Sequence, residues 1–218
     1  DTIIPYHLVE NAIHRDVEGD DDLPSVWGLD VSRFGNDKTA LCKRQGSVVT
    51  EIRSWSGLDL MQTVGRVVAE YDSLQPSRRP REVLVDSIGL GSGVVDRLRE
   101  IGLPVRGVNV AEAPSMGETY LNLRSELWFK TKAWFEDRAC KLPKDDQLVA
   151  ELTGIRYSFT SSGKMKAESK DEMRKRGLAS PDLADALCLT MASDAATALS
   201  GAFTSWRGEI KRNLRGIA

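Results

Sequence analysis

Four aspartates occupy positions from which their carboxylates could act together. Asp30 ends one apolar segment, and Asp86 ends another. Asp182 and Asp185 lie three residues apart in the stretch SPDLADAL, which places them on one face of a helix. If the strands that carry Asp30 and Asp86 are neighbours and the last helix crosses their ends, the four carboxylates converge.

Convergent carboxylates repel one another, and a hard divalent cation with oxygen ligands relieves that repulsion. Two such ions, about 3.5–4 Å apart, can clamp the attacking and leaving oxygens of a phosphodiester during in-line displacement. In this interpretation Asp30 bridges two divalent metal ions (Mg²⁺ or Mn²⁺) and Asp86 completes one site. The acids of the last helix complete the other site.

Three of the four aspartates also have a simpler structural interpretation. An aspartate at the end of a strand is commonly a turn or capping residue. With Ser180 as N-cap and Pro181 as the first helical residue, Asp182 takes the second position, where the helix dipole favours an acid. Asp185 is flanked by leucine and alanine, and an unpaired charge in such surroundings is costly. We therefore expect Asp185 to be the indispensable acid of the pair.

The pattern around these acids alternates between strands and helices. Three short apolar segments joined by turns, the first turn at 33–37, predict an antiparallel meander. The strand that ends at Asp86 precedes a glycine-rich turn, a helix and another strand, an order that predicts a parallel crossover. The expected strands are 25–32, 38–45, 46–55, 83–86 and 103–110. The expected helices are 59–74, 93–102, 118–138 and 144–155, and a hairpin is expected around 161–163 before the last helix.

Composition limits the classes of protein that fit. The chain has 218 residues, of which 41% are hydrophobic and 28% are charged, enough for one large α/β domain. Its net charge of −2 gives no overall cationic field. Three cysteines without a CxxC pair argue against a disulfide scaffold or a zinc site. No apolar run approaches the roughly 18 residues of a membrane span, so we expect no membrane partner.

Charge is nevertheless distributed unevenly along the chain. Residues 1–22 carry seven acids against Arg15 alone, so we interpret 1–24 as an acidic linker that includes a short amphipathic helix. Residues 201–218 form a basic C-terminal tail. A second basic segment leads into the last helix, and its six cations are candidates for DNA phosphate contacts: Lys164, Lys166, Lys170, Arg174, Lys175 and Arg176.

Three sequence blocks resemble the nuclease domain of tailed-bacteriophage terminase large subunits, the DNA-packaging motors. They are WGLDVSRFGNDKTAL, VLVDSIGLGSGVVDRL and KMKAESKDEMRKRGLASPDLADALCLT, and the third is the most specific. The resemblance covers roughly residues 25–192. It implies an α/β, RNase H-like fold with a central mixed β-sheet flanked by helices and a β-hairpin before the last catalytic helix.

The resemblance also implies a function. It predicts a metal-dependent DNA endonuclease that cuts concatemeric viral DNA during genome packaging, with catalytic acids at Asp30, at Asp86 and at the Asp182/Asp185 pair. The implied partners are double-stranded DNA, the terminase small subunit, the portal protein and an ATPase domain of the same full-length chain. The implied location is the cytoplasm of the infected bacterial host.

The glycine cluster of this chain does not fit a nucleotide-binding loop. The stretch GLGSGVVD lacks the GK[ST] of a Walker phosphate loop. We therefore expect residues 25–200 to be a nuclease domain that follows a separate ATPase domain. The alternatives are another nuclease of the same fold, such as a Holliday-junction resolvase, an actin-like phosphotransferase lobe, and a non-catalytic DNA-binding or interaction module.

Overall fold

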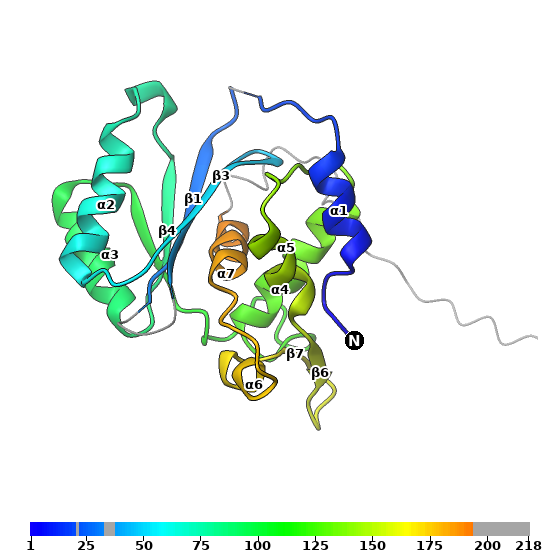
Figure 1. Cartoon of the computed structure of the whole chain (residues 1–218). Helices are drawn as coiled ribbons and strands as arrows, with labels where there is room; N and C mark the ends of the chain where they lie inside the picture. Colours follow the sequence, from blue (N-terminus) through cyan, green and yellow to red (C-terminus); the bar gives the residue numbers. More distant parts are fainter. Residues whose placement is uncertain (21, 33–37, 194–218) are drawn as a thin grey trace, which may run out of the picture.

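A five-stranded mixed sheet organises the computed structural model, which describes residues 1–20, 22–32 and 38–193 (Figure 1). The strand order is β3-β2-β1-β4-β5. The first three strands form the predicted antiparallel meander, and β4 and β5 run parallel to β1. The strands are β1 (Ser25–Asp30), β2 (Thr39–Gln45), β3 (Val48–Trp55), β4 (Glu82–Asp86) and β5 (Val105–Val108).

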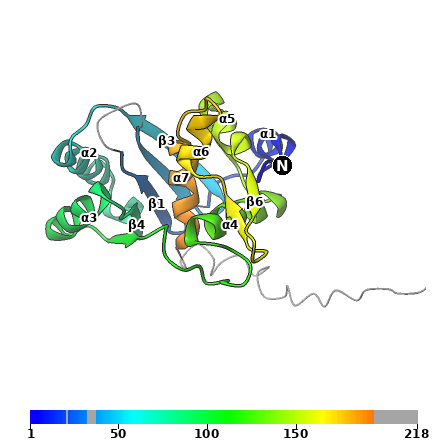
Figure 2. The same cartoon turned by 90° about the horizontal axis from the view of Figure 1, so that it is seen from below.

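Helices cover both faces of this sheet and bury a hydrophobic core on each. Side chains alternate between the faces, so Val26 belongs to one core while Trp27 and Leu29 belong to the other. Figure 2 shows α2 and α3 on one face and α4, α5 and α7 on the opposite face. These helices are α2 (Leu60–Asp72), α3 (Leu90–Ile101), α4 (Leu123–Glu136), α5 (Asp146–Gly154) and α7 (Asp182–Leu189), and short 3₁₀ turns lie at Pro76–Arg78 and Thr190–Ala192.

Capping residues explain where several helices begin. The α2 helix starts after Asp59, whose side chain accepts from the Gln62 amide in a capping box. The α4 helix starts later than the predicted residue 118, because the Asn122 side chain accepts from the Ser125 amide and caps the helix there. The preceding segment contacts the hairpin instead, where the Leu121 amide donates to the Met165 carbonyl.

The region before the last helix contains the predicted hairpin, formed by β6 (Tyr157–Phe159) and β7 (Met165–Ala167). It also contains a short helix that we did not predict, α6 (Lys170–Lys175), which starts with a capping box between Ser169 and Glu172. The predicted start of the last helix is wrong by one residue: Pro181 is the N-cap and Asp182 is the first helical residue. The Pro181 ψ of 58° is not helical, and the Ser180 side chain makes no cap.

The expected acidic linker 1–24 is partly folded onto the domain. The α1 helix (Tyr6–His14) buries Val9 and Ala12, and Ile3 and Ile4 before it are buried as well. The Ile3 amide donates to the Ile155 carbonyl at 3.0 Å, so this segment is anchored next to α5. The apolar side chains of residues 3–12 therefore form part of the core.

Some expectations fall on parts of the chain outside the described residues. These are the turn 33–37, the end of the 25–200 domain and the basic tail 201–218.

All three cysteines are free and buried in the structure. Within the described ranges, no helix has the length and apolar character that crossing a membrane requires.

Candidate active site

Asp30 and Asp86 end adjacent parallel strands. The register pairs Leu29 with Val85, so the two aspartates are the next residues along β1 and β4. Because these strands run in the same direction, both carboxylates lie at the carboxyl edge of the sheet. The condition for convergence, that the strands of Asp30 and Asp86 be neighbours, is therefore met.

The α7 helix crosses β1 at very short range because β1 contains a glycine. A Cβ atom at Gly28 would lie 2.0 Å from the Ala186 carbonyl oxygen and 3.0 Å from Thr190 Cγ2. Only a residue without a side chain permits this approach. The close crossing brings Asp185, which lies on α7, to the same edge of the sheet.

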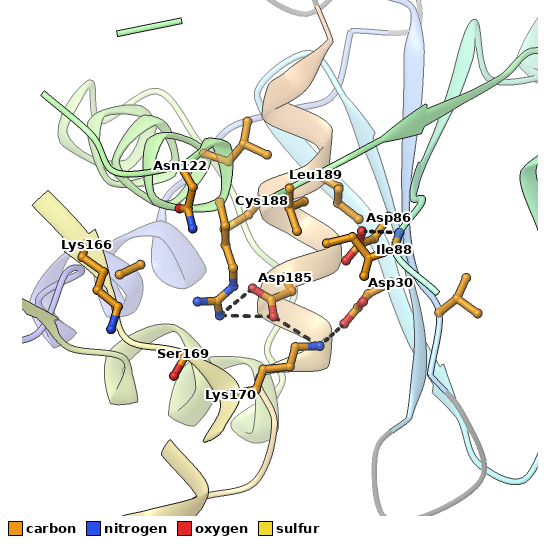
Figure 3. A pocket seen from close by; sticks show the side chains of 15 residues that line it. Asp30, Asp86, Ile88, Asn122, Lys166, Ser169, Lys170, Asp185, Cys188 and Leu189 are labelled. Atoms are coloured by element: carbon orange, nitrogen blue, oxygen red, sulfur yellow. Dashed lines mark hydrogen bonds and ion pairs between the residues drawn. The ribbon is translucent and has the colours of Figure 1, made fainter. Parts of the chain in front are cut away.

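A cavity of about 360 Å³ opens between these elements (Figure 3). Three of the predicted acids line it, one each from β1, β4 and α7. Asp182 instead lines a neighbouring cavity of about 290 Å³, together with Glu151. The residues that line the larger cavity include Asp30, Asp86, Ile88, Asn122, Arg124, Lys166, Ser169, Lys170, Asp185 and Cys188.

The Lys170 ammonium stands among the acids and links them. Its Nζ lies 2.9 Å from Asp30 Oδ2, 3.4 Å from Asp182 Oδ1 and 3.5 Å from Asp185 Oδ2. Its pKa is raised: burial alone would lower it, but the three carboxylates outweigh burial. Asp182 and Asp185 therefore line different cavities but both contact the Lys170 ammonium. Figure 3 shows this ammonium between Asp30 and Asp185.

Asp185 is held in place by donors from α4. The indole Nε1 of Trp128 donates to its Oδ1 at 2.9 Å, and Arg124 Nη2 lies 3.1 Å from the same oxygen. Burial raises the pKa of this carboxyl, but the Arg124 and Lys170 cations outweigh burial and hold the pKa below its usual value. Asp185 is therefore an ionised acid with a fixed orientation.

Asp30 and Asp86 have a different electrostatic balance. Burial raises the pKa of Asp30, and the Lys170 ammonium offsets that effect only in part. Burial likewise raises the pKa of Asp86, although its Oδ1 accepts the Ile88 amide at 3.1 Å. The two strand-end carboxyls therefore take up a proton more readily than Asp185, and a cation would favour their charged forms.

The chemistry of these donors fits a hard divalent cation. The site offers carboxylate oxygens from three directions, and oxygen is the donor that Mg²⁺ and Mn²⁺ prefer. Within the described ranges, no three acidic, histidine or cysteine side chains already form a metal-binding group. The Lys170 ammonium instead supplies positive charge between Asp30 and Asp185.

The six cations of the basic segment occupy different environments. Lys166 and Lys170 line the larger cavity, and Lys166 also pairs with Glu172. Three others lie outside it: Arg174 pairs with Asp171, Arg176 pairs with Glu168, and Lys175 is exposed. Lys164 is half-buried beside the hairpin turn. Only two of the six therefore reach the cavity itself.

Sequence reasoning missed two partners of Asp185. One is Trp128, a fully buried residue whose indole orients the acid. Arg124 was not singled out. The two residues are spaced i, i+4 on α4, so a cation one helical turn before a buried tryptophan was the available signal.

Comparisons with protein-family models and with curated proteins find no match. Solved structures do match. The nuclease domain of the large terminase subunit of bacterial virus Sf6 is 23% identical, with 88% of this chain and 99% of that chain covered and a TM-score of 0.74. The large terminase nuclease from thermophilic phage G20c, with bound magnesium, is 16% identical over 88% and 97% of the two chains, with a TM-score of 0.65.

A third similar structure is the large terminase nuclease domain of Thermus phage P74-26, which is 14% identical and has a TM-score of 0.63. That match covers 87% of this chain and 94% of the other. Other structures of the Sf6 and G20c domains contain manganese, calcium or cobalt. The predicted fold class is thereby confirmed: this chain has the RNase H-like α/β fold of the nuclease domains of phage large terminases.

Proposed function

We propose that this domain is a divalent-metal-dependent DNA endonuclease that acts by two-metal-ion phosphodiester hydrolysis. The observation that carries the proposal is the meeting of Asp30, Asp86 and Asp185 around one cavity, from three separate elements. The fold shared with terminase nuclease domains, some of them with bound Mg, Mn or Co ions, supports the same chemistry.

Each acid has a role that follows from its surroundings. Asp30, whose carboxylate lies 2.9 Å from the Lys170 ammonium, would contribute to both metal sites, and Asp86 and Asp185 would each contribute to one. Ions held there would stabilise the attacking and leaving oxygens of the scissile phosphodiester. Trp128 and Arg124 fix the Asp185 carboxylate, so this ligand loses little conformational freedom when it binds. Asp182 supports the site from the neighbouring cavity.

The biological setting is part of the same proposal. The domain would cut concatemeric viral DNA during genome packaging, as the nuclease part of a longer chain with an ATPase domain. Its partners would be double-stranded DNA, the terminase small subunit and the portal protein, in the cytoplasm of the infected bacterial host. The resemblance in sequence and the similarity in fold support this setting together.

Phosphate contacts would come first from cations that line the cavity. Lys166 meets this condition, whereas Lys175 is exposed on α6 outside it. Each phosphate contact contributes about one unit to the slope of log affinity against log salt. Replacing Lys166 by alanine should therefore reduce the slope for duplex DNA by about one. An unchanged slope would remove Lys166 from the DNA-binding surface.

Plasmid cleavage tests the proposal directly. Supercoiled DNA should be nicked or linearised with Mg²⁺ or Mn²⁺ and should stay intact with EDTA. The Asp30→Asn variant should be inactive, because it keeps the shape of the ligand and removes its charge. The matched control is Asp59→Asn, an exposed N-cap at which asparagine serves equally well. Intact plasmid under every divalent condition would refute the proposal for this domain.

A further inference from the structure

The α7 helix begins without a cap of its own. The first amides of any helix lack intrahelical acceptors and need another partner. The N-cap of α7 is Pro181, whose side chain offers no acceptor. The Pro181 carbonyl accepts a hydrogen bond at 2.7 Å from the Asp185 amide, which lies further along the helix. The amides of Leu183 and Ala184 therefore depend on a group from another element.

Glu151 on α5 provides that acceptor. Its Oε2 accepts the Ala184 amide at 3.0 Å, and the Leu183 amide is a further donor to the same carboxylate. Its Oε1 accepts from Gln147 Nε2 at 2.7 Å, so the carboxylate is anchored on α5. Glu151 is only 9% exposed. A buried carboxylate at a helix N-terminus also interacts favourably with the helix dipole.

The position of this contact connects it to the candidate active site. Ala184 directly precedes Asp185, so the Glu151 carboxylate fixes the backbone of the first turn that presents the acid. Glu151 lines the neighbouring cavity and is absent from the lining of the larger one. Any effect on cleavage must therefore pass through α7.

We infer that Glu151 is a positioning residue, which caps α7 from α5 and thereby holds Asp185 at the cavity. The inference rests on the proposed nuclease function and adds a residue outside the candidate metal ligands. A misplacement of about 1 Å in a catalytic group can cost about 100-fold in rate. Loss of the cap should therefore lower cleavage while the domain stays folded.

Amide hydrogen exchange in EDTA tests the cap without metal or DNA. In Glu151→Ala, exchange of the Leu183 and Ala184 amides should be faster than in the wild type. In Glu151→Gln it should stay slow, because the amide oxygen still accepts. The control is Leu152→Ala, a fully buried neighbour on α5 that loses core packing but keeps the cap. Exchange in Glu151→Ala equal to that in the control would overturn the inference.

Manganese binding by calorimetry and cleavage kinetics test the consequence for the site. All variants are measured well below their melting temperatures. We expect Glu151→Ala to bind Mn²⁺ about 10-fold or more weakly, in the range seen when groups that orient metal ligands are removed. Its kcat should fall by about 100-fold with KM for DNA unchanged. Glu151→Gln should recover both values to within a few-fold, and Leu152→Ala should retain them.

The outcomes separate this inference from the proposed function. A wild type that neither binds Mn²⁺ nor cuts DNA would refute the function and, with it, the catalytic consequence of the cap. An active wild type whose Glu151→Ala variant binds Mn²⁺ and cuts normally would refute only the positioning role. If Glu151→Ala does not fold, Glu151→Asp replaces it, because its carboxylate is one methylene too short to reach Ala184.

Discussion

Replacing Gly28 by alanine should damage the site more than the fold. The new Cβ would lie 2.0 Å from the Ala186 carbonyl oxygen, well over 1 Å closer than a carbon–oxygen contact allows. The Thr190 methyl, at 3.0 Å, blocks a sideways escape. Therefore β1 and α7 must separate by about 1 Å. Overpacking of this kind costs about 1–3 kcal/mol in free energy of unfolding.

The same separation moves Asp185 away from Asp30. A displacement of about 1 Å in a catalytic constellation can reduce the rate by about 100-fold. For a domain of this size, 1–3 kcal/mol lowers the melting temperature by about 2–12 °C. Plasmid cleavage with Mn²⁺ should therefore be measured at a temperature at which circular dichroism shows both proteins to be folded. We expect a loss of activity far larger than the fraction unfolded explains.

The matched control is Gly65→Ala on α2. A Cβ at Gly65 would meet nothing within 4 Å, and alanine is the better helix former by about 0.5–1 kcal/mol. This variant should melt slightly higher and cut at the wild-type rate. If Gly28→Ala matches the wild type in both melting temperature and cleavage, the close β1–α7 crossing does not position the acids, and this reasoning is refuted.

The remaining predictions concern charge. Asp185→Asn should abolish cleavage at saturating Mn²⁺, whereas Asp182→Asn should retain part of it. The opposite ranking would show that the metal ligand is Asp182, in the neighbouring cavity, and would contradict our assignment. Lys170→Met should lower the free energy of unfolding in EDTA by about 1–3 kcal/mol, because the buried carboxylates lose their cation, which is about one-third exposed. Urea denaturation measures this change, and an unchanged free energy would show that the ammonium is dispensable. Burial raises the pKa of Glu151 from 4.5 to about 7, so the folded protein binds this proton more tightly than the unfolded chain and loses stability as pH rises through that range. The stability of Glu151→Gln relative to the wild type should therefore increase by about 3 kcal/mol between pH 4 and pH 8 in urea denaturation, and a pH-independent difference would contradict the assignment.

The positions of the two strand-end acids could be predicted because parallel, buried strands have a clear sequence pattern. Apolar runs that end abruptly in aspartate identify both the strand and its carboxyl edge, as at Asp30 and Asp86. The crossover between β4 and β5 then follows from the order of strand, helix and strand. Local sequence thus determines which edge of the sheet holds the acids.

The different directions of Asp182 and Asp185 could not be predicted from spacing. A separation of three residues leaves two side chains about 60° apart around a helix axis. At the first turn of α7 this angle is enough to divide them between two cavities. The Lys38 amide, which donates to Asp182 Oδ2 at 2.7 Å, is brought there by the β2 strand. Such a partner is a tertiary contact, and the spacing of the acids contains no information about it.

The missed α6 helix had a local signal that we did not use. Its six residues are largely charged and have no apolar periodicity, so the pattern indicated a solvated basic segment. However, Ser169 and Glu172 have the spacing of a capping box, which marks a helix start even where periodicity is weak. The helix places Lys170 at its first position, directed towards the acids.

The α7 helix is held at both ends by polar side chains from other elements, Glu151 at the N-terminus and Arg44 at the C-terminus. Beyond its C-terminus, the buried Arg44 guanidinium donates to the Thr190 carbonyl at 2.8 Å and to the Thr190 hydroxyl at 2.8 Å. Burial lowers the pKa of Arg44 to about 10, yet the group stays charged at neutral pH. The Arg44 cation complements the helix dipole at the C-terminus, and Glu151 complements it at the N-terminus when its carboxyl is ionised. The element that carries Asp185 is therefore fixed along its axis by β2 and α5, which lie outside the cavity.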